Sequence, residues 1–200
     1  MAILGYRFWR VWFLKDDAVV TGVYYADHVW TGAQWNNARC AWTDQPSLFS
    51  ASGRVCDGCE FGIHTRGHSW GFYAMKTVED AVREFYRSSL CSVHAVPFRR
   101  FLGMSAEDIA AQTRLIFGIV ALAGKVVEAE KGYRATRAFP VGVFGPGPQA
   151  VYVYRIEEMK WVEAWWPLYE DWPVIGPEFD FLELFAKAKE ERSRRHEHWP

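Results

Sequence analysis

Cysteine and histidine residues in two short pairs are the side chains of this sequence best suited to chemistry. Cys56 and Cys59 have the C-x-x-C spacing at which backbone amides can turn toward both thiolates. Cys91 and His94 form a second pair of the C-x-x-H type. Together they make a Cys₃His set, a usual ligand set for structural zinc. We therefore predict a zinc site at Cys56, Cys59, Cys91 and His94.

Two alternatives to this ligand set stay open. Cys40 with His64 or His68 can replace one of the pairs. The four thiols can also be reduced and partly buried, because a free cysteine packs as a small hydrophobic residue. A thioredoxin-like redox role is disfavoured, since no strand-to-helix pattern surrounds the C-x-x-C pair.

An enzymatic alternative rests on polar residues near the same segment. His64 and Arg66 lie close together in the sequence, with Glu60 and His68 beside them, and could serve acid–base chemistry in a cleft. The strand-like segment 71–74 followed by a helix is similar to ADP-ribosyltransferase-like folds. Those folds need an upstream basic or histidine residue and a downstream glutamate, for which Arg7 or His28 and Glu128 are the candidates. This alternative places an active or nucleotide-binding pocket beside His64, Arg66, Glu128 and Arg134.

Tryptophan is unusually abundant, with eleven residues in a chain of 200. The densest group contains Trp161, Trp165, Trp166 and Trp172. Strand alternation would place Trp161 and Trp165 on one face and Trp166 on the other. Because tryptophan is enriched at protein interfaces, we predict that these four residues form a recognition surface. The alternative is that they fill a tryptophan-rich core.

Composition and charge restrict the class of protein. Half of the residues are hydrophobic, enough for a substantial core, and the formal net charge is −1, so a nucleic-acid partner is not indicated. No signal peptide is recognised, and the longest apolar run, 115–127, contains Lys125 and is shorter than a span of about 20 residues. We expect a cytoplasmic protein without a membrane segment, whose four cysteines do not form a disulfide framework.

The elements that must position these side chains follow from local patterns. Aromatic and β-branched residues predict a strand at 3–14 in a hairpin with 18–25, then an irregular Cys/His segment at about 30–69. Residues 71–76 predict a strand, and Thr77 with Asp80 marks the start of a helix. The later expected elements are a short helix at 105–113, a strand at 115–128 with a bend or bulge at Gly124, a strand at 134–139, a loop at 142–149, strands at 151–155 and 161–166, and a helix at 178–196.

These elements predict an α+β protein, with a mostly antiparallel, strongly twisted sheet, two or three helices and an irregular Cys/His-containing loop region. We expect one domain over 1–176, followed by an amphipathic C-terminal helix and tail over 177–200.

Several motifs resemble a family of small, largely uncharacterised proteins of actinobacteria and their phages. They are GYRFWRV at the start, NARC, the Cys pair followed by GIH, and GIVALAGKVVEAEKGYRATRAFP. The resemblance covers about two thirds of the chain and is densest at 118–140. The family usually has a His-x-Pro element between the first cysteine and the later pair, whereas no histidine lies between Cys40 and Cys56. The resemblance implies an origin and no activity.

Taken together, the sequence predicts a non-enzymatic binding protein of actinobacterial or phage origin. Its partner would be a protein, such as a host protein, held by the Trp-rich surface, and zinc would order residues 40–94.

Overall fold

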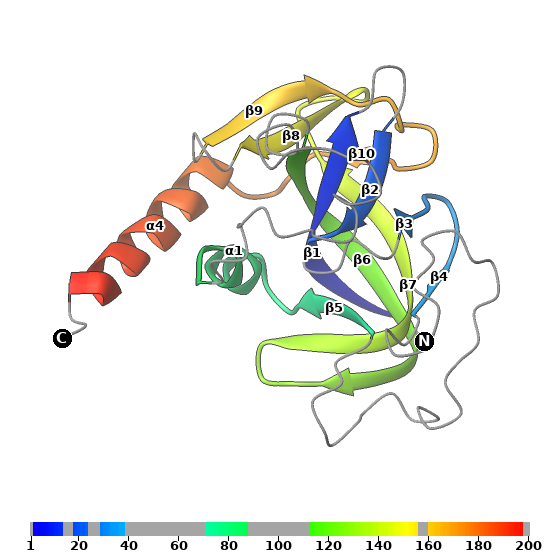
Figure 1. Ribbon diagram of the computed structural model, residues 1–200, viewed down its shortest axis with the longest axis horizontal. Coiled ribbons are helices and arrows are strands. Elements are labelled where there is room, and N and C mark those ends of the chain that lie inside the picture. Colours follow the sequence, from blue (N-terminus) through cyan, green and yellow to red (C-terminus); the bar gives the residue numbers. More distant parts are fainter. Residues whose placement is uncertain are drawn as a thin grey trace, which may run out of the picture.

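The computed structural model describes residues 2–13, 18–23, 29–38, 71–87, 113–155 and 160–197, which form a curled sheet packed with two helices (Figure 1). All strand pairings among these residues are antiparallel except one short parallel pairing. The predicted α+β class and mostly antiparallel sheet are therefore confirmed. Residues 105–112 of the predicted short helix and most of the irregular segment lie outside the described residues, and Thr113 already belongs to a strand.

The N-terminal hairpin forms where the sequence predicts it. Strand β1 (Ile3–Phe13) pairs with β2 (Ala18–Gly22) in an antiparallel register. The indole Nε1 of Trp12 donates a hydrogen bond to Thr21 Oγ1 at 3.2 Å, so the polar end of a buried ring has a partner across the hairpin.

The longest pairing in the sheet joins β6 (Thr113–Glu128) to β7 (Gly132–Phe144). Its register shifts between Ala123 and Val126, and Gly124 in this interval has a φ of +73°. Glycine adopts this left-handed conformation without the steric penalty of a Cβ atom. The predicted bulge at Gly124 is confirmed.

Strand β7 is longer than the sequence predicts, and the loop expected from residue 142 begins only after Phe144. Val143 pairs with Gly118 of β6 on one side and with Val174 of β10 (Val174–Ile175) on the other. Strand partners on both sides therefore satisfy the backbone hydrogen-bonding groups of this segment. Gly142 would otherwise weaken it as an isolated strand.

Strand β5 (Phe72–Met75) leads into helix α1 (Val78–Arg87) through a capped turn. Thr77 Oγ1 accepts a hydrogen bond from the backbone N–H of Asp80 at 3.1 Å. The predicted N-cap is confirmed, and it satisfies one of the free amides at the start of the helix.

Four strands form a closed circuit of pairings. β1 pairs with both β6 and β5, and β7 also pairs with both β6 and β5. The circuit is so tight at β5 that a Cβ on Gly5 would lie 2.7 Å from the Cβ of Ala74, and one on Gly132 would lie 2.6 Å from the Ala74 carbonyl oxygen. Glycine at both positions lets β1 and β7 approach the two sides of β5.

The remaining strands extend the sheet at both ends. β8 (Ala150–Arg155) pairs with β6 and with β9 (Lys160–Trp165), close to the predicted segments. At the other end, β3 (Val29–Trp30) pairs with β2. The short β4 (Asn36–Asn37) pairs with β7 in the interior of the strand order.

Two aromatic clusters make up the core. The tryptophan cluster is built around Trp9, Trp30, Trp166 and Trp172. The phenylalanine cluster is built around Phe8, Phe85, Phe117, Phe144, Phe181 and Phe185. The alternation of β1 separates them, since Trp9 joins the first cluster and the preceding Phe8 joins the second.

Helix α4 (Phe181–Glu197) and α1 lie on the same side of the sheet and cover the phenylalanine cluster (Figure 1). Asp180 Oδ1 accepts hydrogen bonds from the amides of Leu182 and Glu183 at 2.8 and 3.2 Å, so Asp180 caps the helix. The sequence predicted that this helix starts three residues earlier, at Glu178. Neither described helix is long and apolar enough to cross a membrane.

Candidate binding surfaces

The predicted zinc ligands Cys56, Cys59, Cys91 and His94 lie outside the described residues, as do the alternatives Cys40, His64 and His68. Within the described ranges, no three His, Cys, Asp or Glu side chains are grouped so that they could hold a metal ion. The zinc site therefore stays a prediction from the sequence.

The structure separates the four tryptophans that were predicted to form one recognition surface. Trp161, Trp166 and Trp172 have exposed fractions of 9%, 0% and 1%, whereas Trp165 is 64% exposed. Three of the four residues are therefore core residues in this fold. The surface expected from the sequence reduces to Trp165.

Helix α4 is the reason that Trp161 is covered. The ring of Trp161 lies 4.9 Å from that of Phe181 and 5.1 Å from that of Phe185, measured between centroids. Trp165 follows four residues later on the same face of β9, and the residue opposite it on β8 is Ala150, which offers no ring to pack against.

Trp166 and Trp172 are buried together on the other side of the sheet. Trp166 Nε1 donates a hydrogen bond to the carbonyl oxygen of Trp172 at 3.3 Å, and the two rings are 6.5 Å apart. Trp172 also packs edge-on against Trp9 at 5.3 Å. The segment between β9 and β10 thus contributes the rings of Trp166 and Trp172 to the tryptophan cluster.

Trp165 lies at the end of β9, which borders the sheet formed by the described residues. Among the described residues, β9 pairs only with β8. Lys160 and Glu163 are also exposed along β9, and charged side chains of this kind discourage unspecific pairing at a sheet edge. A large exposed ring on such a strand offers an anchor for a binding partner.

Glu128 is the carboxylate of the pocket predicted by the enzymatic alternative. It forms an ion pair at the surface. Its Oε1 accepts a hydrogen bond from Lys76 Nζ at 2.6 Å, and its side chain is 65% exposed. This hydrogen bond raises the pKa of Lys76 above the ordinary lysine value. His64 and Arg66 of the same predicted pocket lie outside the described residues.

A second surface, which the sequence did not reveal, lies at the end of the β6–β7 hairpin beside β5. Three cations there stand over aromatic rings. Lys76 Nζ is 5.4 Å from the Tyr133 centroid, and the guanidinium carbon of Arg134 is 5.7 Å from that of Tyr73. The third pair, Arg137 over Trp35, measures 5.1 Å.

The two Gly-Tyr-Arg triplets of the sequence flank β5 in this region. The first is 5–7 in β1, and the second is 132–134 in β7. Their arginines converge on one residue: Arg7 donates to the backbone carbonyl of Tyr73 at 2.6 Å, and Arg134 donates to its hydroxyl at 3.2 Å. The two triplets are offset by one residue in their register on β5, since Tyr6 and Gly132 both pair with Met75.

A shallow hollow lies between β1, β5 and α1, next to the first triplet. It is lined by Tyr6, Arg7, Phe8, Val23, Tyr73, Ala74, Met75, Ala81, Glu84 and Phe85. The guanidinium of Arg7 also stands over the Trp30 ring at 4.7 Å. The lining is dominated by side chains of the phenylalanine cluster, so the hollow is mainly a gap in packing between helix and sheet.

Comparisons with protein families, curated proteins and solved structures found no match for this chain.

Proposed function

We propose that this chain is a non-enzymatic binding protein that anchors a protein partner on Trp165. The observation that carries the proposal is the 64% exposure of Trp165 in a fold that buries Trp9, Trp12, Trp30, Trp161, Trp166 and Trp172. The resemblance described above makes a host protein the expected partner if the chain is phage-encoded.

The energetic argument comes from the area of the ring. A tryptophan can bury ~150–250 Å², so covering the exposed part of Trp165 would contribute roughly 2–4 kcal/mol at ~25 cal/mol per Å². Binding costs offset part of this gain, and for that reason interface energy concentrates in a few such anchors.

The test compares substitutions at two positions whose side chains have nearly the same exposed fraction. Leu182 on α4 is 66% exposed, so Leu182→Ser is the matched control for Trp165→Ser. Each tagged protein is immobilised and incubated with a lysate of the source organism or its host, and retained proteins are identified by mass spectrometry. We expect a protein that the wild type and Leu182→Ser retain and Trp165→Ser loses.

Direct contact is tested with a photo-crosslinking amino acid placed at 165 and, as the control, at 182. The same protein should be crosslinked from position 165 only. Retention of an unchanged set of proteins by Trp165→Ser, or no specific retention by the wild type, would contradict the proposal.

A further inference from the structure

Positive charge is concentrated at the end of the β6–β7 hairpin. We define the hairpin-end surface by its cations Lys76, Lys125, Lys131, Arg134 and Arg137 and its rings Tyr73, Tyr133 and Trp35. Its five cations, set against the carboxylates of Glu128 and Glu130, give a formal charge of +3. These described residues therefore carry a net positive charge in a chain whose formal total is −1.

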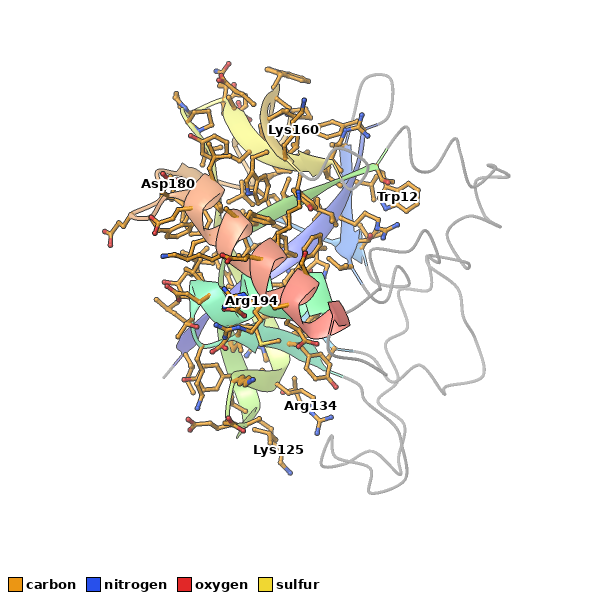
Figure 2. The ribbon with its side chains drawn as sticks, turned by 90° about the vertical axis from the view of Figure 1, so that its left-hand side faces the viewer. Trp12, Lys125, Arg134, Lys160, Asp180 and Arg194 are labelled. Carbon is orange, nitrogen blue, oxygen red and sulfur yellow. The ribbon has the colours of Figure 1, made fainter. Side chains whose placement is uncertain are left out.

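Strand pairing brings these charges together from distant parts of the sequence. Gly132 pairs with Met75, and the backbone N–H of Lys76 donates to the carbonyl of Lys131 at 3.0 Å. The bulge at Gly124 places Lys125 beside Thr136, whose Oγ1 accepts its N–H at 3.1 Å. Figure 2 shows Lys125 and Arg134 at the same end of the molecule, far from Lys160 and Asp180, with their charged ends pointing away from its body.

Aromatic rings accompany three of the cations at this end of the molecule. Each of Tyr73, Tyr133 and Trp35 carries a cation over its ring, at the distances given above. Trp35 is 36% exposed and contacts Phe139 at 5.6 Å. The buried Asn36 fixes its position, because the amide oxygen and nitrogen of Asn36 bond the backbone N–H and carbonyl of Thr31, each at 3.0 Å.

We propose that the hairpin-end surface binds single-stranded nucleic acid. Lysine and arginine heads would contact phosphates, and an unpaired base would stack on Trp35, the combination by which single strands are held without sequence preference. Arginine suits this role because its planar guanidinium bonds phosphate through two N–H groups. Glu128 opposes binding little, because Lys76 already neutralises it.

The proposal is independent of the contact at Trp165, which lies on the edge strand β9 and is not part of this surface. It also revises the expectation from the sequence, where the net charge gave no indication of a nucleic-acid partner. The net charge does not indicate this surface, because its cations are brought together only by the pairing of β7 with β5 and β6.

The test measures fluorescence anisotropy of a labelled 20-nucleotide thymidine strand with the full chain at 50 mM salt. If about four phosphates are neutralised, the logarithm of the association constant should fall with the logarithm of salt with a slope of about −3. We expect micromolar binding, and at least tenfold weaker binding with a shallower slope for Lys125→Glu combined with Lys131→Glu.

The matched control reverses two exposed lysines of α4, with Lys187→Glu and Lys189→Glu, and changes the net charge equally. It should bind within about threefold of the wild type. Trp35→Ala should weaken binding about tenfold with the slope unchanged, because stacking releases no counterions. Circular dichroism confirms that every variant is folded.

Three results would overturn the proposal. The first is no saturable binding at 50 mM salt. The second is an equal loss in the α4 control, which would indicate only non-specific attraction. The third is displacement by poly-glutamate as effective as by unlabelled thymidine strand, which would indicate an acidic protein partner.

Discussion

Arg83 of α1 and Glu191 of α4 form an ion pair across the two helices, with Arg83 Nε 3.0 Å from Glu191 Oε2. The residues are 108 positions apart in the sequence. Arg83 also reaches Asp80 in the preceding turn of α1 at 3.0 Å. The hydrogen bond to Glu191 is the main reason that the pKa of Arg83 is raised. The pair joins the C-terminal helix to the middle of the chain at the surface above the phenylalanine cluster.

A double-mutant cycle tests how much this pair stabilises the docked α4. Arg83→Ala, Glu191→Ala and the double variant should give a coupling free energy of about 0.2–1 kcal/mol in urea unfolding, because both side chains are partly exposed. The coupling should shrink at high salt. A value indistinguishable from zero at low salt would mean that packing alone holds α4 on α1.

The tight closure at β5 gives a second prediction. Gly5→Ala would place a Cβ 2.7 Å from the Cβ of Ala74, and Gly132→Ala would place one 2.6 Å from the Ala74 carbonyl oxygen. Both changes should destabilise the fold by about 1–3 kcal/mol, the usual cost of overpacking.

Ala74→Gly distinguishes the two sites. It removes the methyl group that clashes in Gly5→Ala but leaves the backbone oxygen that clashes in Gly132→Ala. Thermal unfolding should therefore show favourable coupling of Ala74→Gly with Gly5→Ala and none with Gly132→Ala. Equal coupling in both double variants would refute the proposed closure geometry.

The ion pair of Lys76 with Glu128 predicts a pH dependence at the alkaline end. Because the folded-state pKa of Lys76 is raised, the stabilisation is complete below the unfolded value of about 10.4 and is lost as pH rises through the folded value. The stability difference between wild type and Lys76→Met should be constant from pH 7 to 9 and narrow above about pH 10. In a Glu128→Gln background this change with pH should disappear.

The different burial of Trp165 and Trp166 predicts losses of stability of very different size for substitutions at these adjacent positions. Trp166→Ala should cost about 3–5 kcal/mol, because it empties a fully buried site and leaves a cavity. Trp165→Ala should change the free energy of unfolding by less than about 1 kcal/mol. Urea unfolding followed by circular dichroism measures both, and similar losses would show that Trp165 is packed in solution.

The zinc site is tested by elemental analysis of the purified chain. We expect one zinc per chain, lost in a Cys56→Ser, Cys59→Ser variant, and a lower melting temperature after chelation, because structural zinc contributes folding free energy directly. A metal-free protein whose melting temperature is insensitive to chelator would exclude the site.

Much of the secondary structure was predictable because its signals are local. Thr77 with Asp80 marked the start of α1, Gly124 marked the bulge of β6, and aromatic and β-branched residues marked β1. Each signal depends on neighbouring residues only, and each appears in the structure. The predicted end of β7 was wrong because the last residues of this strand pair with β10, which lies about 30 residues later in the sequence.

The candidate surfaces were much less predictable. Alternation correctly placed Trp161 and Trp166 on opposite sides of the sheet, but it carried no information on what covers each side. Burial of Trp161 depends on Phe181 and Phe185 of α4, and burial of Trp166 depends on the tryptophan cluster. The hairpin-end surface was not predictable because Lys76 reaches Tyr133, and Arg134 reaches Tyr73, only through the pairing of β5 with β7.

By itself, then, the sequence determined most of the longer strands and helices among the described residues, the cap of α1 and the bulge of β6. These properties follow from backbone propensity, capping and periodicity within a few residues. Only the tertiary structure decided which rings are covered and which charges are neighbours. Both depend on contacts between segments brought together by sheet pairing and helix docking, and such contacts leave no local trace in the order of residues.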